Sequence, residues 1–305
     1  MKRKTGAKPF LKWAGGKTQL IPTIEKFLPY ELFSDKFTYV EPFVGSGAVL
    51  FWMLNNFPKM EKAVINDINS DLVNVYKTIR SSPKDLISIL EIFQSEFYGL
   101  QDEEEKKKEY YYQKRDSYNA RNTHKTEQAA LFIFLNRTCF NGLYRVNRSN
   151  LFNVPMGSYK YPMICDKQNI KAVSEVLENV EILNDGDFEK TISYANEKTF
   201  FYLDPPYKPL STTSSFNSYA ENEFGDNEQI RLRNFCVKLD AQNSKWMLSN
   251  SDIQDNDFFD ALFKDFFIKR VDAKRVINSK GDKRGILSEL LITNYKTQKT
   301  FLFSV

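Results

Sequence analysis

Hydrophobic and polar positions along the chain predict strands and helices in alternation. Residues 37–54, "FTYVEPFVGSGAVLFWML", read as a β-rich stretch, a small-residue turn and an apolar helix. A second apolar run ends at Asn66-Asp67, and a helical pattern resumes at Ser70. Two consecutive strand–helix units predict a parallel sheet, because parallel strands need a crossover connection.

The pattern changes between residues 81 and 135, where long charged segments indicate helices. The charge run at 102–118, "DEEEKKKEYYYQKRDSY", is typical of a solvated helix face. Residues 139–157, "CFNGLYRVNRSNLFNVPMG", combine an Asn-Gly pair, alternating aromatic and basic residues and a Pro-Met-Gly turn, which together favour a β-hairpin.

Strand-like apolar runs resume in the last part of the chain, at residues 180–189, 199–207, 244–250 and 287–295. We therefore expect an α/β fold in which one domain, residues 1–80 and 166–305, is split by a mainly helical insertion over 81–165.

Composition narrows the possible functions. The chain has 305 residues, and 43 Lys and Arg against 39 Asp and Glu give a small positive excess that matters only where it is clustered. The three cysteines, Cys139, Cys165 and Cys236, lack the spacing of metal ligands, and His124 is the one histidine. The sequence therefore offers few residues for a metal site or a histidine-based triad. No apolar run approaches the roughly 18 residues of a membrane span, and we expect a cytoplasmic protein without a metal.

The stretch Asp204-Pro205-Pro206-Tyr207 directly follows a strand-like run. Prolines fix φ and remove backbone donors, so they must end the strand and stiffen the turn. Open α/β sheets bind ligands at the carboxyl ends of strands. A carboxylate, a free carbonyl and an aromatic face suit a flat ring with an exocyclic amine; the alternative is a strand-ending turn with a capping Asp.

Two glycine-containing stretches are candidates for cofactor binding. In "EPFVGSG", residues 41–47, glycines allow a close backbone approach, and Asp67, about 20 residues later, suits a ribose; the alternative is a tight packing turn. "AGGKT", residues 14–18, is no phosphate loop, because Leu11 stands where that pattern needs glycine. Trp13 and Lys17 beside it are suited to covering and holding a cofactor, unless this is a plain surface loop.

Five segments in order resemble the Dam-type (class alpha) DNA adenine-N6 methyltransferases, particularly those of restriction systems of the DpnII and MboI kind: "FLKWAGGK", "VEPFVGSGAVL", "INDINSDL", "LNRTCFNGLYRVNRSNLFNVPMG" and "FYLDPPYKPLSTTSSF". The resemblance covers most of the chain and weakens in 85–128 and in the final thirty residues. It implies a Rossmann-like sheet that binds S-adenosylmethionine, and a DNA-recognition subdomain at 81–165. It also implies methylation of duplex DNA, within GATC, as protection in a restriction-modification system.

The resemblance assigns these residues to the cofactor pocket: Trp13, Lys17, Glu41, Phe43, Gly45, Gly47, Asp67, Asp187 and Asp204. Asp187 is expected to reach the cofactor adenine, a role for which Asp185 competes. Asp204, Pro205, Pro206 and Tyr207 are the expected catalytic residues.

The chemistry of an adenine amino group explains why such a turn is needed. Its lone pair is delocalised into the ring, so we expect Asp204 and the Pro205 carbonyl to accept its two N–H bonds while Tyr207 stacks on the base. A base inside a duplex cannot reach the pocket and must be flipped out.

The resemblance also implies a DNA-contacting set: Lys12, Phe140, Asn141, Leu143, Arg145, Asn153 and Pro155. Arg137 and Arg148 join this set because they cluster with Arg145 and with aromatic residues rather than alternating with acids. Phe140 is expected to wedge into the duplex and Arg145 to hold a guanine through two bonds. The alternative is an ordinary edge hairpin with solvated arginines. We further expect a lid at 208–227 and phosphate contacts at 274–285.

Other functions remain open from the sequence. The same fold could methylate cytosine N4, RNA or a protein amide, and a non-enzymatic DNA-binding module is a further alternative. Methylation at cytosine C5 is disfavoured because none of the three cysteines lies in a Pro-Cys turn. We expect a monomer or weak dimer.

Overall fold

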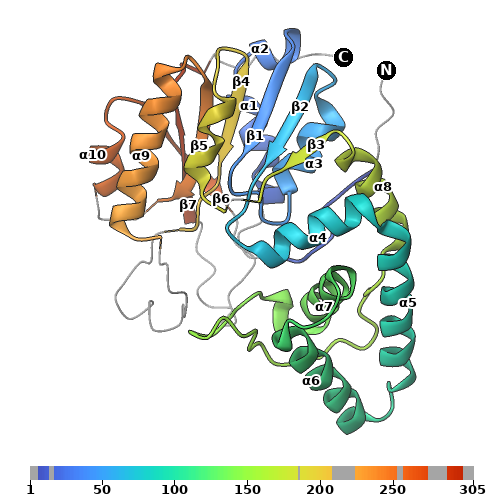
Figure 1. Cartoon of the computed structure of the whole chain (residues 1–305). Coiled ribbons are helices and arrows are strands. Elements are labelled where there is room, and N and C mark those ends of the chain that lie inside the picture. The colour runs from blue at the N-terminus through green and yellow to red at the C-terminus, as the bar shows by residue number, and fades with distance from the viewer. Residues whose placement is uncertain are drawn as a thin grey trace.

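A computed structural model describes residues 6–13, 17–184, 186–207, 224–252, 257–273 and 287–297. The described residues form a seven-stranded sheet in the order β3-β2-β1-β4-β5-β7-β6 (Figure 1). Its strands are β1 (Phe37–Glu41), β2 (Met60–Ile65), β3 (Val180–Ile182), β4 (Thr199–Leu203), β5 (Lys245–Ser251), β6 (Phe267–Ala273) and β7 (Leu287–Thr293).

Strands β3, β2, β1, β4 and β5 are parallel, and β7 runs antiparallel between β5 and β6. The chain moves from β1 outward to β2 and β3, then returns to place β4 on the other side of β1. The order therefore reverses between β1 and β4, and such a switch point opens a crevice at the carboxyl ends of the strands. The predicted α/β, Rossmann-like fold is confirmed.

Helices enclose the sheet because its strands are apolar toward both faces. They are α1 (Ile21–Phe27), α2 (Glu31–Ser34), α3 (Ala48–Asn56), α4 (Ser70–Ser81), α8 (Lys167–Leu177), α9 (Asp226–Ala241) and α10 (Phe258–Leu262), with the 3-10 turns η1 (Lys17–Gln19) and η3 (Phe188–Tyr194). In β4, Phe200 and Tyr202 enter one hydrophobic core, and Phe201 and Leu203 enter a second core with α9 and α10.

Three helices between β2 and β3 account for the charged segments, α5 (Pro83–Gly99), α6 (Glu104–Ala120) and α7 (Lys125–Thr138). In Figure 1, α6 and α7 lie below the sheet and α5 runs down one side. Most of α6 is exposed, as predicted for its charge run, whereas α7 is buried over most of its length. The core of these helices is continuous with that of α4.

The predicted hairpin at 139–157 is only partly right. The described chain there makes isolated antiparallel bridges, Cys139 to Met156 and Val146 to Phe152, and no regular ladder. The chain reverses at 147–150, where Asn147 Oδ1 accepts hydrogen bonds from the backbone N–H groups of Ser149 and Leu151. We call residues 147–151 the recognition turn, after the DNA-contacting role that the sequence predicts for this stretch.

The Asn-Gly pair is not the turn of that hairpin. Asn141 and Gly142 belong to the 3-10 turn η2 (Phe140–Gly142), and both have positive φ, 54° and 63°. A Cβ on Gly142 would lie 2.5 Å from Cβ of Lys12, so the glycine is needed for close packing of two chain segments. An Asn-Gly pair suits both a hairpin turn and a turn such as η2, so the sequence pattern alone predicts a strand reversal here.

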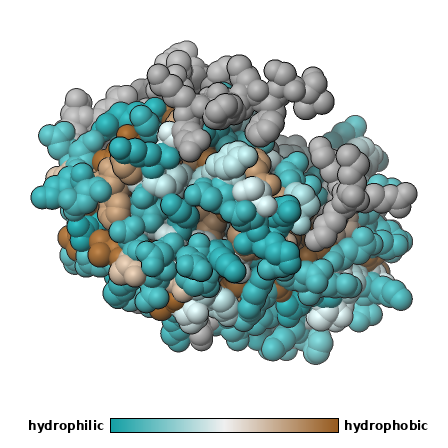
Figure 2. Space-filling view, turned by 90° about the horizontal axis from the view of Figure 1, so that it is seen from above, coloured by the Kyte–Doolittle hydropathy of each residue, from teal (hydrophilic) through white to brown (hydrophobic). Residues whose placement is uncertain are grey.

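Strand β6 was not predicted. It is an edge strand whose Lys269 and Arg270 interrupt the apolar alternation, as edge strands often require to avoid aggregation. Seen from above, hydrophilic side chains cover most of the described surface, and the hydrophobic ones form small scattered groups (Figure 2). In the described ranges, no helix is long and apolar enough to span a membrane.

Candidate active site

The site lies at the switch point, where β1, β2 and β4 each end near an acidic residue. Glu41 is the last residue of β1, Asp67 lies two residues beyond β2, and Asp204 directly follows β4. Asp67 and Asp204 are both close enough to help raise the pKa of Glu41, although burial is the larger cause. The fold thus gathers three carboxylates that are far apart in the sequence.

Asp204 is anchored through one of its two oxygens. Oδ1 lies 2.8 Å from Nζ of Lys17 and accepts a hydrogen bond from Oγ of Ser249 at 3.0 Å. Burial raises the pKa of Asp204, and Lys17 opposes that rise by favouring the charged form. Among the described residues both polar partners reach Oδ1, so Oδ2 is left to accept from a ligand.

Tyr207 is held by the same lysine and by a buried acid. Its hydroxyl accepts a hydrogen bond from Nζ of Lys17 at 2.6 Å and donates to Oε1 of Glu289 at 2.7 Å. Glu289 lies on β7, and its Oε2 is 3.7 Å from the same ammonium. Burial alone would lower the pKa of Lys17, but Asp204, Tyr207 and Glu289 outweigh it and raise that pKa.

Sequence reasoning missed Glu289 and Ser249. The signal for Glu289 was a single acid in the apolar run "LSELLIT", where a buried charge needs a partner. Neither contact could be anticipated, because Ser249 reaches Asp204 only where β5 pairs with β4. Glu289 reaches Tyr207 only where β7 enters the sheet beside β5. Of the two prolines, Pro205 is buried and Pro206 is exposed.

The glycine turn between β1 and α3 closes over Asp67. The Gly45 N–H donates to Oδ2 of Asp67 at 2.9 Å, and the Asn69 N–H donates to Oδ1 at 2.9 Å. Gly47, with φ of 74°, begins α3, and a Cβ there would lie 2.6 Å from the Tyr76 hydroxyl. Both positions therefore need glycine for geometric reasons, and these reasons hold equally for a packing turn and for a cofactor pocket.

Aromatic rings border this turn on both sides. Trp13 lies against Gly45, where a Cβ would be 3.1 Å from the indole, and its ring stacks on Tyr144 with centroids 5.6 Å apart. Phe43 packs against Phe188, whose ring centroid is 5.2 Å away. The turn thus combines the Asp67 carboxylate, an acceptor, with neighbouring aromatic faces, a combination suited to holding a nucleoside.

Asp187 is already engaged in protein contacts. It accepts a hydrogen bond from the Glu189 N–H at 2.9 Å and forms an ion pair with Arg231 of α9. Burial alone would raise the pKa of Asp187, but the hydrogen bonds from Glu189 and Arg231 outweigh it and lower that pKa. Its competitor, Asp185, lies outside the described residues.

Most of the predicted DNA-contacting residues lie on one stretch, from η2 to residue 155. Phe140 is 48 % exposed despite being a large apolar residue. Asn141, Arg145, Arg148 and Pro155 are exposed, and Leu143 and Asn153 are half-buried. Arg145 is aligned by Asn153, whose Oδ1 accepts from Nε at 2.7 Å.

Lys12 and Arg137 lie outside that stretch of sequence, although Lys12 packs against Gly142 of η2. The Lys12 ammonium is 3.9 Å from the centre of the Tyr159 ring. The side chain of the buried Asn136 accepts from the Lys12 N–H and donates to the Lys12 carbonyl, a contact that the sequence did not reveal. The Arg137 guanidinium turns inward and donates to the Phe10 carbonyl at 2.8 Å, where burial lowers its pKa. The structure therefore does not bring Arg137 together with the exposed arginines.

Two predicted loops fall on residues without a described structure. The predicted lid at 208–227 is described only from 224, and the basic stretch at 274–285 is not described. Within the described part of the chain, no group of three or more His, Cys, Asp or Glu side chains could hold a metal ion.

A sheet of this order, with the Asp-Pro-Pro-Tyr turn at its switch point, is consistent with a Rossmann-like methyltransferase fold. The model of the D12 class N6 adenine-specific DNA methyltransferases matches residues 13–277. The chain belongs to this family, and the predicted enzyme class, a DNA adenine-N6 methyltransferase, is confirmed.

Three relatives match over nearly their whole length. The chain is 52 % identical to the type II methyltransferase M.MjaIII of Methanocaldococcus jannaschii, over 94 % of this chain and 99 % of the relative. It is 41 % identical to the type II methyltransferase M1.LlaDCHI of Lactococcus lactis subsp. cremoris, over 96 % of this chain and 98 % of the relative. It is 33 % identical to the DNA adenine methylase of Haemophilus influenzae, over 95 % of each chain.

Proposed function

We propose that this protein transfers a methyl group from S-adenosylmethionine to N6 of an adenine that is flipped out of duplex DNA. The observation that carries the proposal is the anchoring of Asp204, with Oδ1 held by Lys17 and Ser249 and Oδ2 available as an acceptor. A pocket at the switch point can take one base only if that base leaves the stack, at a cost of a few kcal/mol.

The residues around Asp67 fit the cofactor. Its carboxylate, fixed by two backbone N–H groups, is an acceptor pair for ribose hydroxyls, and the Trp13 face suits an apolar or cationic group. When bound, the cofactor supplies a methyl group on a sulfonium, which is already activated for direct transfer. No side chain needs to form a covalent intermediate.

Asp204 and the Pro205 carbonyl act on the amine. Each accepts one N–H of the adenine amino group, which draws the nitrogen toward tetrahedral geometry and makes its lone pair available. Tyr207 stacks on the base, and its ring is fixed because Lys17 and Glu289 both hold the hydroxyl. Lys17 also favours the charged form of Asp204, which is the stronger acceptor.

We propose that the stretch from Phe140 to Pro155 reads the DNA, with Phe140 as the wedge and Arg145 as the guanine contact. Arg145 already presents its guanidinium in a fixed orientation, which suits bidentate recognition. We propose GATC as the recognition sequence, and a protective role in a restriction-modification system, since two relatives are named type II methyltransferases. The protein then acts in the cytoplasm as a monomer or weak dimer.

Expression in cells that lack adenine methylation, followed by base-resolution mapping of modified DNA, tests this function. The proposal expects N6-methyladenine at one short sequence, GATC, and nowhere else. Methylation at a different sequence would overturn the specificity alone. Methylated cytosine, or no modified DNA with a folded protein, would overturn the proposed reaction.

A further inference from the structure

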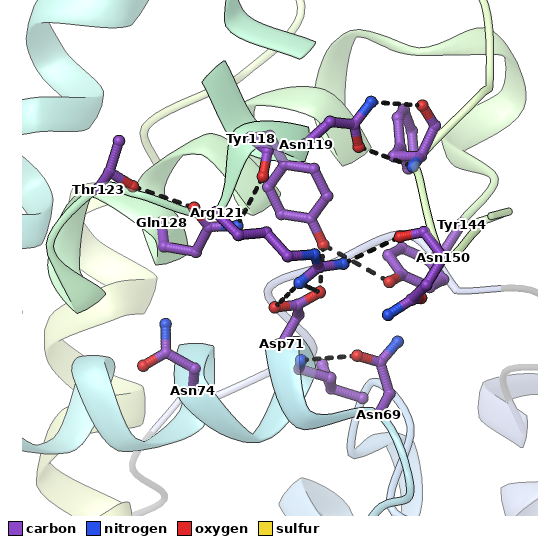
Figure 3. Close-up of polar contacts among 12 residues, drawn as sticks. Asn69, Asp71, Asn74, Tyr118, Asn119, Arg121, Thr123, Gln128, Tyr144 and Asn150 are labelled. Carbon is purple, nitrogen blue, oxygen red and sulfur yellow. Dashed lines mark hydrogen bonds and ion pairs between the residues drawn. The ribbon is translucent and has the colours of Figure 1, made fainter. Parts of the chain in front are cut away.

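A charged cluster lies between the proposed cofactor pocket and the recognition turn (Figure 3). At its centre is Asp71, in the first turn of α4, with a side chain that is 13 % exposed. Nη1 of Arg121 donates to Oδ1 and Oδ2 of Asp71 at 2.7 and 2.6 Å, and the Tyr118 hydroxyl donates to Oδ2 at 2.7 Å. Hydrogen bonds between charged partners are the strongest that proteins form, so this junction is stiff.

On one side, Asp71 is joined to the cofactor pocket by a short and well-fixed piece of chain. Asn69 donates its backbone N–H to Asp67, and its side-chain Oδ1 caps α4 by accepting from the Leu72 N–H at 3.0 Å. The cap satisfies one of the unpaired N–H donors of the first turn and so ties Asn69 to the start of α4. Whatever fixes the Asp67 carboxylate therefore also fixes Asp71.

On the other side, Arg121 reaches the recognition turn. Its Nη2 donates to the Asn150 carbonyl at 3.2 Å, next to the exposed Arg148. Two residues earlier in α6, Asn119 holds the chain just beyond the turn, accepting from the Phe152 N–H at 2.7 Å and donating to its carbonyl at 3.0 Å. The C-terminal end of α6 thus forms hydrogen bonds with both α4 and the recognition turn.

A parallel aromatic contact runs beside the ion pair. The hydroxyls of Tyr118 and Tyr144 are 3.5 Å apart, and Tyr144 stacks on Trp13 of the proposed cofactor pocket. Figure 3 shows Tyr118 and Arg121, both from the end of α6, converging on Asp71, with Tyr144 of another segment beside Tyr118.

We propose that Arg121 and Asp71 are positioning residues that couple cofactor binding to DNA binding, an inference that rests on the proposed function. Cofactor bound at Asp67 fixes the start of α4, and Asp71 then holds Arg121 and the recognition turn in place. DNA meets a turn that is already ordered, so less conformational entropy is lost on binding. By linkage, DNA must strengthen cofactor binding by the same factor.

A purely structural ion pair would behave differently. It would contribute to stability, but the affinity for cofactor would not depend on whether DNA is bound. The distinguishing quantity is therefore the ratio of two dissociation constants, not activity or melting temperature.

Isothermal titration of S-adenosylhomocysteine into the full chain measures this ratio, with and without a saturating duplex that the wild-type protein methylates. We expect the wild-type protein to bind the cofactor product at least about fivefold more tightly with DNA. Arg121→Gln should reduce the ratio to near one while changing the affinity without DNA by less than about twofold. Arg121→Lys should give an intermediate ratio, because lysine keeps the charge but loses the planar fork.

Arg270→Gln is the matched control. Arg270 also pairs with carboxylates, those of Asp260 and Asp252, but it lies on β6 at the far edge of the sheet. Its loss should leave the ratio at the wild-type value.

Hydrogen–deuterium exchange supplies a second readout. S-adenosylhomocysteine should slow exchange at residues 147–152 in the wild-type protein and not in a folded Arg121→Gln variant. A wild-type ratio in that variant, or a ratio of one in the wild-type protein, would overturn the coupling and leave the methylation reaction intact. A wild-type protein that methylates no DNA would instead overturn the proposed function.

Discussion

Lys17 and Asp204 form an ion pair of 2.8 Å in which the lysine side chain is only 4 % exposed. The two residues are far apart in the sequence, and the pair joins the glycine-containing N-terminal segment to the end of β4. A carboxylate in such a place would tend to take up a proton, because burial disfavours its charge. Lys17 therefore acts on the proton equilibrium of Asp204 as well as on its position.

Replacing Lys17 by Gln should move the pH dependence of methyl transfer toward higher pH. Burial raises the pKa of Asp204 and Lys17 opposes that rise, so loss of the cation raises the pKa further. The charged form of Asp204, which is the stronger acceptor, then appears only at higher pH. The rising limb of kcat against pH, with both substrates saturating, should move upward in pH. Lys36→Gln, which breaks the exposed pair with Glu61, should leave the profile unchanged; identical profiles for all three proteins would refute this role of Lys17.

Glu289→Ala should slow methyl transfer by about tenfold, the effect of one hydrogen bond of about 1.4 kcal/mol. The Tyr207 hydroxyl loses its acceptor and the ring loses its fixed orientation. Glu289→Gln keeps an acceptor oxygen and should lose less. Glu181 is the control, because it also binds a tyrosine and a lysine, Tyr194 and Lys62, but away from the site. Single-turnover rates decide the matter: equal losses in Glu181→Ala and Glu289→Ala would assign Glu289 to stability alone.

Gly47→Ala should weaken cofactor binding and destabilise the fold by about 1–3 kcal/mol. Its φ is 74°, and the added Cβ would lie 2.6 Å from the Tyr76 hydroxyl, which holds Gly45 in place. Gly99→Ala, at the exposed end of α5 with open space around it, should be neutral or stabilising by up to about 1 kcal/mol. Urea unfolding with and without S-adenosylhomocysteine measures both effects, and a Gly47→Ala protein as stable as Gly99→Ala would contradict the geometry.

Arg145 and Arg148 should differ in what they recognise. Arg145→Ala should lose about 1–3 kcal/mol of discrimination between the methylated sequence and a duplex altered by one base. Arg148→Ala should weaken both duplexes equally and reduce the salt dependence of binding by a slope of about 0.9. Fluorescence anisotropy over a series of salt concentrations separates these outcomes. An equal loss on both duplexes for Arg145→Ala would make it a phosphate contact.

Local patterns were sufficient for the framework of the fold. The runs ending at Glu41, Asp67 and Leu203 are long and apolar, and each is followed by a turn or helix signal, so β1, β2 and β4 were predicted with their order along the chain. β6 was missed because its charged residues Lys269 and Arg270 interrupt the apolar alternation that predicts a strand. The same charges protect an exposed edge strand from aggregation. The turn at 147–150 was misplaced because Asn141-Gly142 carries a stronger local signal.

The site was predictable as far as its residues follow strands or, like Lys17, belong to the segments that carry the family resemblance. Asp204 and Asp67 were identified from their positions after apolar runs. Glu289 and Ser249 were not, because their contacts with Asp204 and Tyr207 depend on which strands become neighbours. The inward turn of Arg137 likewise depends on the N-terminal segment packing against α7, which no local pattern encodes.

Tritium transfer from labelled S-adenosylmethionine into a duplex, followed by digestion to nucleosides, tests the central role of Asp204 most directly. Asp204→Ala should bind the duplex with nearly wild-type affinity and transfer methyl groups to adenine at least about 100-fold more slowly, because the amine loses its charged acceptor. Wild-type turnover by a folded Asp204→Ala protein would contradict the account.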